Sequence, residues 1–419
     1  MELSPPRGTR DFFPDQMRLR TWLFEHFRET ARLFSFEEYD APVLESLELF
    51  TRKAGEDIVG QVYNFEDKGG RAVALRPEMT PSLARLILQK GRSLALPVRW
   101  FSIPQCWRYE RMTRGRKREH YQWNMDIFGV EGPTAEAELL AAITTFFRRL
   151  GLTAQDVGIK VSSRKVLQGV LASIGVNDES FEAVCVLVDK LDKLPREAIE
   201  KDMADLGLGA EIIDRIVDTM SCKSLDDLEA ILGAEHEAVL ELRELFALAE
   251  GYGYSDWLQF DACIVRGLAY YTGIVFEAFD RGATLRAICG GGRYDRLLST
   301  FGGTDIPACG FGFGDVVIVE LLSDKGLLPD TAQAIDDLVF AFGSEQRGPA
   351  AQVAGRLRAA GRSVELILEE RKVKWAFKRA DRLGARRVVL VAPDEWQRGE
   401  VRIKDLRSGQ ESNHKVEDL

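Results

Sequence analysis

The chain has 419 residues, of which 45% are hydrophobic and 29% are charged, a composition typical of a soluble protein with two or three domains. No apolar run reaches the roughly 18 residues that a membrane-spanning helix needs, and the first residues lack the features of a secretion signal. Six scattered cysteines and four scattered histidines argue against a zinc cage, a disulfide framework and a metal held by histidines. We expect a cytoplasmic protein without membrane contact, or one from an organellar stroma or matrix if a presequence was removed.

The net charge is −10, but the charge is unevenly distributed. Between Asp178 and Glu250 there are 20 acidic and 7 basic residues. Basic residues gather in two other segments, 108–118 and 371–387. Because such local positive segments can bind phosphates, the acidic total does not exclude a nucleic-acid partner.

The first predicted elements are a helix, an interrupted strand and a hairpin. The helix begins at Pro14 and keeps an apolar face at helical spacing up to Leu33. The strand at 38–44 contains a proline, which is typical of an edge or an interface. Residues 62–75 predict a hairpin that turns at 68–70.

Strands continue on both sides of an acidic middle segment that is mainly helical by pattern. Before it, strands at 98–110 and 121–130 flank a polar loop at 112–120. After it, strands are predicted at 257–265, 271–279 and 285–289. A glycine-rich stretch at 310–314 then leads into a helix at 316–322. Successive hairpins favour an antiparallel sheet. We predict an α+β fold, with an antiparallel-sheet domain at 1–163 and 254–325 and a helical insertion at 164–253.

The C-terminal part differs in pattern from the rest. A linker at 326–334 is followed by alternating strands and helices, at 338–342, 346–360, 363–368, 373–383 and 387–391. This alternation predicts a small α/β domain with a parallel or mixed sheet at 334–419.

Two strand segments carry polar residues that could form a ligand pocket. Arg108 and Glu110 share one face of a strand, where the arginine could hold a phosphate and the glutamate could accept from a base amino group. The alternative is a cross-strand ion pair beside a solvated loop. Glu78 and Thr80 follow a proline, and Gln122 and Asp126 face one way on the next strand. These side chains could converge on one ammonium group, or they could be ordinary sheet-face polarity.

A third segment combines a cation with aromatic walls. Arg266 precedes a glycine that lets a ligand approach the backbone, and a positioned arginine can stabilise charge that develops on phosphorus. Tyr270 and Tyr271 suit a polar aromatic ring, although a pair of tyrosines is often core or interface. Further on, three glycines at 290–292 are expected to form a turn between a strand and a helix that walls the pocket with backbone.

Taken together, these segments resemble histidyl-tRNA synthetases, a family of class II aminoacyl-tRNA synthetases. The similarity covers nearly the whole chain and keeps the family's order. The shared motifs are Pro-Arg-Gly-Thr-Arg-Asp at 6–11, Arg-Pro-Glu at 76–78, Arg-Tyr-Glu at 108–110, Arg-Gly-Leu-Ala-Tyr-Tyr at 266–271 and Gly-Gly-Arg-Tyr-Asp at 291–295. The last two are peculiar to this family and its close relatives.

The resemblance implies an enzyme that activates L-histidine with ATP, releases pyrophosphate and transfers histidine to the 3′ end of tRNA(His). Arg266 would be the catalytic cation, with Arg108 on the α-phosphate and carboxylate. The residues implied to bind histidine are Glu78, Thr80, Arg108, Gln122, Asp126, Arg266, Tyr270 and Tyr271. Of these, Glu78, Thr80, Gln122 and Asp126 would hold the amino end, and the two tyrosines the imidazole. The residues implied to bind ATP are Arg108, Glu110, Arg116, Arg118 and Arg293.

The resemblance also implies partners. Mg²⁺ should accompany ATP. The segment around Pro42 matches the family's dimer-forming first motif, so a homodimer is expected. The C-terminal domain resembles the anticodon-binding domain, and its basic helix at 373–383 could face tRNA phosphates.

Three positions depart from the family pattern. Ala269 stands where aspartate is usual, and Asp126 stands where glutamate is usual. Val317 occupies the place of the third-motif arginine that contacts the ATP phosphates. Either another arginine substitutes, such as Arg293 or one from the loop at 114–118, or ATP use is impaired. We expect substitution.

Two other functions are compatible with parts of the sequence. One is a catalytically silent relative that binds histidine or uncharged tRNA, such as the synthetase-like regulatory subunit of ATP phosphoribosyltransferase. That relative lacks the C-terminal domain that is present here. The other is a class II synthetase for proline, threonine or glycine, against which the tyrosine pair argues.

Overall fold

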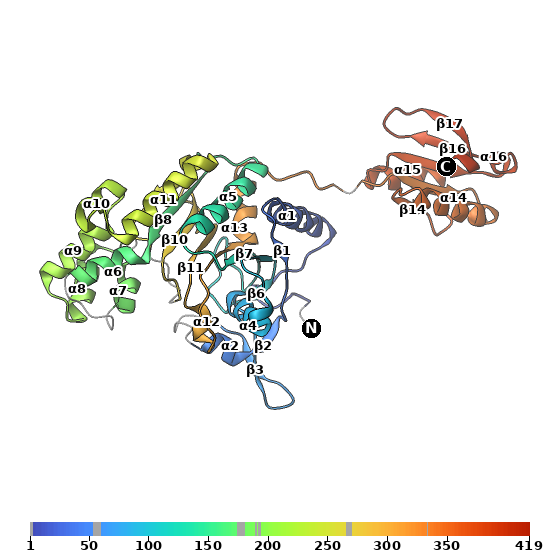
Figure 1. The fold of residues 1–419 in the computed structure, drawn as a ribbon. Helices are drawn as coiled ribbons and strands as arrows, with labels where there is room; N and C mark the ends of the chain where they lie inside the picture. Colours follow the sequence, from blue (N-terminus) through green and yellow to red (C-terminus); the bar gives the residue numbers. More distant parts are fainter. Residues whose placement is uncertain are drawn as a thin grey trace. The chain divides into compact units, whose positions relative to one another are not determined.

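The structure is a computed structural model that describes residues 3–52, 60–173, 181–188, 191, 194–264, 270–332 and 334–419. Two compact units are present (Figure 1). The larger contains Arg20–Leu328 with the N-terminal segment up to Asp11, and the smaller contains Phe12–Leu19 and Pro329–Leu419. In the described part of the chain, no helix is both long and apolar enough to span a bilayer.

A large sheet forms the centre of the larger unit. Among the described residues it has nine strands in the order β1-β5-β7-β12-β11-β10-β8-β9, with β6 paired to β7. Its strands are β1 (Glu37–Glu38), β5 (Val98–Ser102), β6 (Gln105–Trp107), β7 (Glu119–Phe128), β8 (Val157–Ser163), β9 (Leu258–Phe260), β10 (Ile274–Asp280), β11 (Cys289–Arg293) and β12 (Ala308–Gly314). Neighbours are antiparallel except for the two outermost pairs, β1 with β5 and β8 with β9. The predicted α+β fold with an antiparallel sheet is confirmed.

One face of this sheet packs against the main hydrophobic core and the other holds the candidate site, as the residues of β7 show. Its odd residues Trp123, Met125 and Ile127 are buried in the main hydrophobic core. That core is closed by helices α1 (Pro14–Leu33), α5 (Thr134–Arg149) and α13 (Asp315–Asp324). Because side chains alternate along a strand, the even residues of β7 face the opposite side of the sheet, which holds the candidate site.

Shorter elements border that second face. Helices α4 (Thr80–Lys90) and α12 (Leu297–Thr300) share a smaller core with β5 and β10. A three-stranded sheet in the order β2-β4-β3 lies nearby in sequence, with helix α2 packed on it. These elements are β2 (Leu44–Ser46), α2 (Leu47–Thr51), β3 (Asn64–Glu66) and β4 (Ala72–Leu75). The predicted hairpin turning at 68–70 is present as β3 and β4.

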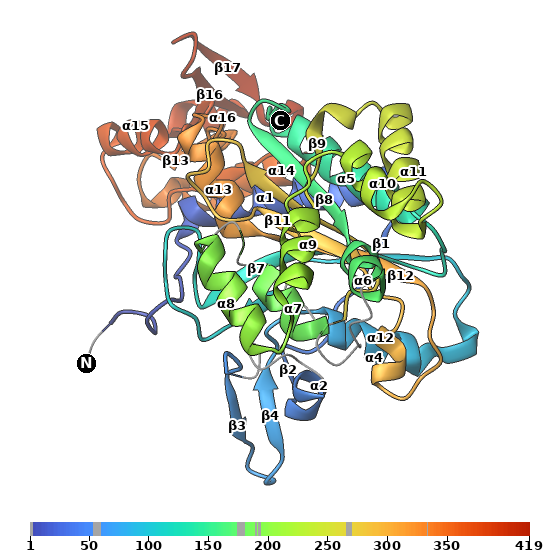
Figure 2. The same ribbon diagram turned by 90° about the vertical axis from the view of Figure 1, so that its left-hand side faces the viewer.

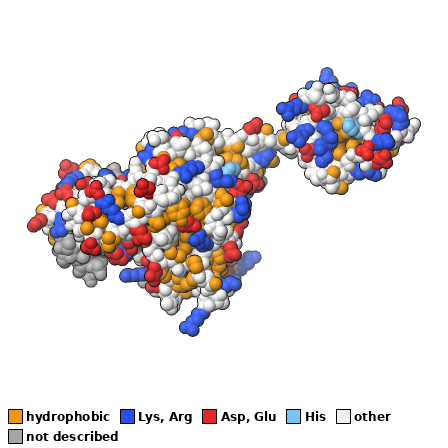
Figure 3. Space-filling model, turned by 45° about the horizontal axis from the view of Figure 1, so that its top comes forward, with side chains coloured by type: hydrophobic (Ala, Val, Ile, Leu, Met, Phe, Trp, Pro, Cys, Tyr) orange, Lys and Arg blue, Asp and Glu red, His pale blue; other side chains and the backbone are white. Residues whose placement is uncertain are grey.

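Helices fill the chain between β8 and β9. They are α6 (Arg164–Ser173), α7 (Phe181–Val188), α8 (Arg196–Asp205), α9 (Ala210–Met220), α10 (Leu225–Leu232) and α11 (Glu237–Tyr252). Figure 2 shows α7, α8 and α9 side by side, and α6 packs against α9 and α11. Apolar side chains such as Ile216, Leu228 and Leu242 are buried inside this group. Its acidic side chains lie on the surface, where Figure 3 shows them over these helices.

The smaller unit contains a mixed sheet between helices. The strand order is β14-β13-β15-β16-β17, parallel among the first three and antiparallel in the rest. Helices α14 and α15 contribute to two separate cores on the two sides of β13 and β15. The elements are β13 (Asp337–Ala341), α14 (Arg347–Ala359), β14 (Val364–Leu366), α15 (Val373–Arg382), β15 (Arg387–Val391), α16 (Pro393–Gln397), β16 (Glu400–Asp405) and β17 (Glu411–Lys415). The predicted mixed α/β arrangement is confirmed.

Several strand predictions were wrong in their bounds or type. The strand predicted at 98–110 is two strands, β5 and β6, and the one predicted at 257–265 shrinks to β9. The largest error concerns the glycine tract. Residues 289–293 form the central strand β11 rather than a turn, because neighbouring strands on both sides supply its hydrogen bonds.

Candidate active site

A cavity of about 410 Å³ opens on the sheet face away from α1 and α5. Its lining comes from the segments around Glu78 and Arg108, from β7, β11 and β12, and from the start of α13. In the lining, Glu78 and Asp126 each accept from a tyrosine hydroxyl, whereas Arg108, Arg116 and Arg286 act electrostatically on one another, with Glu110 beside Arg116. The cavity therefore offers separate places for a cationic group and an anionic group.

Glu78 and Tyr270 form the first acidic part. Glu78 is 7% exposed and is held at the start of α4 by the proline before it. The Tyr270 hydroxyl donates to Glu78 Oε2 at 3.3 Å, and Thr80 lines the cavity beside them. Burial raises the pKa of Glu78, and the nearby Arg108 counteracts this. A ligand ammonium group would interact with this carboxylate in place of the water molecules that burial excludes.

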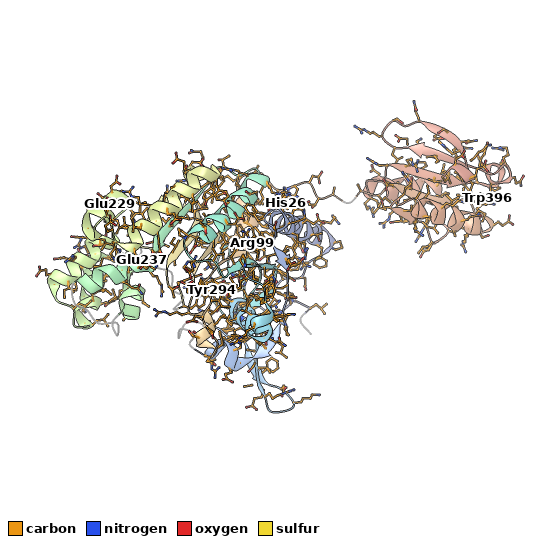
Figure 4. The ribbon with its side chains drawn as sticks, in the orientation of Figure 1. His26, Arg99, Glu229, Glu237, Tyr294 and Trp396 are labelled. Carbon is orange, nitrogen blue, oxygen red and sulfur yellow. The ribbon has the colours of Figure 1, made fainter. Side chains whose placement is uncertain are left out.

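Asp126 forms the second acidic part, deeper in the sheet. Its carboxylate is 4% exposed and accepts a hydrogen bond from the Tyr294 hydroxyl. Burial raises the pKa of Asp126 to about 7, against the lowering effect of that hydrogen bond. The Tyr294 ring lies 5.9 Å from Tyr270 and 6.5 Å from Tyr271, centroid to centroid. Figure 4 shows Tyr294 in the interior of the larger unit. Asp126 thus sits among aromatic rings.

Glycines on β12 keep the space beside β7 open. Gly310 is paired with Asp126, and Gly312 with Asn124. A Cβ at Gly310 would overlap the Asp126 carboxylate and lie 2.7 Å from the Tyr294 hydroxyl. A Cβ at Gly312 would overlap the Gln122 amide. The glycine-rich strand is therefore the part of the floor that leaves polar side chains of β7 accessible.

Arginines form the other part of the cavity. Arg108 Nε donates to the carbonyl oxygen of Pro77 at 2.9 Å, and within the described part of the chain its terminal nitrogens remain for a ligand. Arg116 comes from the polar loop and lies 2.6 Å from Glu110. Arg286 reaches the cavity from the segment between β10 and β11. This arrangement is suited to a phosphate chain.

His120 lies on β7 close to these arginines and also lines the cavity. Burial, together with the positive charges of Arg108, Arg10, Arg286 and Arg116, lowers the pKa of His120 to about 3. The ring is therefore neutral at physiological pH and adds no charge to the arginine cluster.

Comparisons with known proteins show which families the two parts of the chain match. The sequence model of the family described as histidyl-tRNA synthetase matches residues 8–314, and that of the anticodon binding domain matches residues 338–419. The histidine–tRNA ligase of Arabidopsis thaliana, described as chloroplastic/mitochondrial, is 59% identical over 419 residues, which cover 100% of this chain and 86% of the relative. The enzyme of Opitutus terrae is 41% identical over 412 residues, 97% of this chain and 94% of the relative. This chain belongs to the histidyl-tRNA synthetase family.

Solved structures share the fold. Histidyl-tRNA synthetase from Nostoc sp. PCC 7120 has a TM-score of 0.80 at 26% identity, covering 100% of this chain and 99% of that one. A Bacillus halodurans protein described as an ATP phosphoribosyltransferase regulatory subunit/histidyl-tRNA synthetase has a TM-score of 0.77 at 23% identity, covering 93% and 98%. That second likeness concerns the fold alone, and the fold by itself does not separate an enzyme from a regulator.

Most residues that the histidyl-tRNA synthetase motifs implied are brought together. Of those described, the ones that line the cavity are Glu78, Thr80, Arg108, Glu110, Arg116, Gln122, Asp126, Tyr270 and Tyr271. Arg266 and Ala269 lie outside the described residues.

Two arginines implied for ATP are directed elsewhere. Arg293 is 5% exposed and binds Glu136 through Nε at 2.6 Å and its terminal nitrogen at 2.7 Å. Arg118 stacks over the Tyr109 ring at 3.9 Å and donates to the Glu110 carbonyl oxygen. The suggestion that Arg293 replaces the third-motif arginine is therefore wrong, because its guanidinium is already held by a buried carboxylate.

The N-terminal family motif has a positioning role. Arg10 bridges Asp315 at 2.9 Å and Glu119 at 3.1 Å. Asp315 also accepts from the Tyr121 backbone N–H at 2.9 Å. These contacts fix the start of α13 against β7, on the strand that supplies Gln122 and Asp126.

Among the cavity residues that sequence reasoning did not assign to the site are His120, Asn124, Arg286 and Tyr294. His120 and Asn124 could have been found, because they share the even-numbered face of β7 with Gln122 and Asp126. Arg286 lies in an irregular segment with no local signal. Among the described residues, no group of three or more His, Cys, Asp or Glu side chains is placed to hold a metal.

Proposed function

We propose that this chain is a histidine–tRNA ligase, which forms histidyl-adenylate from L-histidine and ATP and then transfers histidine to the 3′ end of tRNA(His). Membership of the family and the cavity, which is lined by buried carboxylates and by three arginines, both support this activity. The single most informative observation is that Glu78, Asp126, Arg108 and Arg116 share one cavity of about 410 Å³. Such a cavity can hold an amino acid beside a nucleotide.

We assign the two acidic positions to different parts of histidine. Glu78, with Thr80 and Gln122, would bind the α-ammonium group, since Glu78 is a buried carboxylate whose pKa is lowered by the charge of Arg108, the residue proposed to hold the histidine carboxylate. Asp126 lies among Tyr294 and its neighbouring rings, so we now assign it to an imidazole N–H rather than to the amino end. A carboxylate that accepts from a ring N–H also selects its tautomer.

The proposed chemistry needs orientation and charge neutralisation. A histidine carboxylate oxygen attacks the α-phosphorus of ATP, the bond from that phosphorus to the bridging oxygen breaks, and pyrophosphate leaves. Arg108 would hold the carboxylate and the α-phosphate, and Arg116 would hold negative charge further along the chain of phosphates. Arg266 would be the catalytic cation by the family resemblance. Glu110 would contact the adenine side by the family resemblance. Arg118 is held over the Tyr109 ring and does not line the cavity, so we do not assign it to ATP.

Mg²⁺ is proposed to accompany ATP. This ion commonly binds through one or two carboxylates together with substrate phosphates. The Glu110 carboxylate is bound by Arg116 at 2.6 Å, and the described residues offer no group of carboxylates placed to hold a metal, so the ion would be held by the ATP phosphates. When bound, the ion would neutralise charge on the leaving phosphates.

The proposed partners and the proposed location rest on separate observations. We propose that residues 338–419, which match the anticodon binding domain, bind tRNA(His). A homodimer is proposed at the small sheet, where Val43, Leu44 and Phe65 are 38%, 44% and 51% exposed. Sedimentation of the purified protein would test this dimer. The Arabidopsis relative supports an organellar compartment over the cytoplasm.

Purified full-length protein tests the proposed function by histidine-dependent exchange of pyrophosphate into ATP, followed by charging of tRNA(His). Exchange that requires histidine and no other amino acid is the expected result. If histidine binds but no exchange occurs, the protein is a regulatory relative. If proline, threonine or glycine supports exchange instead, it is another class II synthetase.

A further inference from the structure

Arg286 lies at the cavity rim and has no part in the assignments above. Its side chain lines the cavity with Arg108 and Arg116. Within the described residues, its guanidinium forms no hydrogen bond or ion pair. Partial loss of contact with water and the charge of Arg116 lower the pKa of Arg286, and Glu110 counteracts this. A guanidinium in this position is complementary to an anion with several negative charges.

Other arginines near the cavity already have protein partners. Arg114, on the same loop as Arg116, binds Glu320 at 3.0 Å and Asp324 at 2.6 Å on α13. Arg293 is held by Glu136, and Arg118 by the Tyr109 ring. In contrast to these three, the Arg286 guanidinium remains available for a ligand.

The space around Val317 explains why the cation comes from this segment. Val317 is buried in the cavity wall at the start of α13. The loop tip at Gly115 closes over it: a Cβ at Gly115 would lie 3.2 Å from Val317 Cγ2 and 3.6 Å from Arg286 Cγ. The loop tip thus rests on the valine and on the aliphatic part of Arg286. A long side chain at position 317 would have to displace the tip, whereas Arg286 reaches the cavity beside it.

We propose that Arg286 binds the β- and γ-phosphates of ATP, and so supplies from the segment before β11 the charge that Val317 cannot supply from α13. This inference rests on the proposed function for the identity of the anion. When the bond between the α-phosphorus and the bridging oxygen breaks, the electron pair goes to pyrophosphate. Arg286 stabilises that leaving group, while Arg108 stays with the α-phosphate.

Binding of ATP and of AMP to the full-length protein tests this assignment, because AMP lacks the β- and γ-phosphates. Calorimetry with ATP–Mg²⁺ and with AMP would be performed on wild type, Arg286→Ala and Arg286→Lys. Arg286→Ala is expected to weaken ATP binding by about 10- to 100-fold and AMP binding by less than about twofold. Arg286→Lys should lie between, since it keeps the charge but loses the paired donors.

Arg296→Ala is the matched control. Arg296 is an exposed arginine ahead of α12 that does not line the cavity, so its removal should leave both affinities unchanged. Unchanged ATP binding in Arg286→Ala, or an equal loss of ATP and AMP binding, would overturn the proposal. Histidine-dependent exchange is measured in parallel. Its absence in the wild type contradicts the proposed function, while the comparison of ATP with AMP still decides the role of Arg286.

Discussion

At the scale of single residues, burial sets the properties of the site. Asp126 and Glu136 are both carboxylates in the interior of the larger unit, but their surroundings differ. Glu136 has a bidentate arginine partner, whereas among the described residues Asp126 accepts one side-chain hydrogen bond, from a neutral tyrosine. A carboxylate without a charged partner is poorly stabilised in such a place. Asp126 is therefore ready to receive a donor from a ligand.

The first prediction concerns pH and stability. The folded protein holds the Asp126 proton with a pKa of about 7, against an ordinary value of 3.8. The folded state therefore binds this proton more tightly than the unfolded chain. The stabilisation of the folded state by this bound proton is lost as pH rises from about 4 to about 7. The loss is on the order of 4 kcal/mol at most. Asp126→Asn removes the titrating carboxyl group and with it this pH-dependent loss of stability. The difference in Tm between the variant and the wild type should therefore shift in favour of the variant from pH 5 to pH 8.

A matched control for this measurement is Asp256→Asn, at an exposed aspartate outside the cavity. Its Tm should follow that of the wild type at every pH. Parallel pH profiles for Asp126→Asn and wild type would show that Asp126 is ionised normally in the folded protein.

The second prediction separates Arg293 from the ATP site. Arg293→Met leaves Glu136, which is 0% exposed, without its charged partner. The free energy of unfolding should fall by about 3–5 kcal/mol, as is usual when one member of a buried pair is removed. Urea denaturation would measure this loss. The double variant Arg293→Met with Glu136→Leu should recover much of it. A stable Arg293→Met protein with weakened ATP binding would instead return Arg293 to the ATP site.

At the scale of elements, the glycine-rich strands β11 and β12 shape the cavity floor. They lie in the middle of the sheet, between β7 and β10. Strands in this position usually carry larger, branched side chains. Here glycine is retained because the neighbouring β7 turns polar side chains toward the same face.

The third prediction tests this role by adding one methyl group. Gly312→Ala places a Cβ against the Gln122 amide and should raise the KM for histidine by about tenfold or more, since the polar group must move. Gly314→Ala, two residues along the same strand, adds a Cβ that meets nothing within 4 Å. It should therefore affect histidine much less. Steady-state exchange kinetics would measure both, and equal effects would mean that the strand backbone, not the space beside Gln122, is what glycine preserves.

Sequence periodicity predicted the elements that depend on local pattern. The helix from Pro14, the hairpin of β3 and β4 and the alternation in the smaller unit follow from apolar spacing and turn residues. It failed for β11, because glycine has no strand preference and only the neighbouring strands reveal its conformation. For the site, motifs predicted Glu78, Arg108 and Asp126. Arg286 could not be predicted, since its approach to the cavity depends on tertiary packing around Gly115.

At the scale of the whole molecule, charge is divided among parts of the chain. The segment from Asp178 to Glu250 has 20 acidic and 7 basic residues, whereas residues 338–419 have 12 acidic and 17 basic residues. Phosphate repulsion disfavours contact between tRNA and most of the acidic helices. The C-terminal part is therefore the better candidate for sequence-independent attraction of RNA.

The fourth prediction follows from that division and from the position of the cavity. All the described cavity residues lie between Gln61 and Val317, so a chain that ends at Leu328 keeps them. Histidine-dependent exchange should remain within about threefold of the full-length value. Charging of tRNA(His) should fall by about 100-fold or more in kcat/KM, because a second binding module linked to the first commonly contributes that much. The full-length protein with Lys374 and Lys378 changed to Ala would show an intermediate loss of charging and normal exchange. Loss of exchange in the shortened chain, with its secondary structure intact, would mean that the smaller unit also supports the active site. Undiminished charging would mean that tRNA is recognised within residues 1–328.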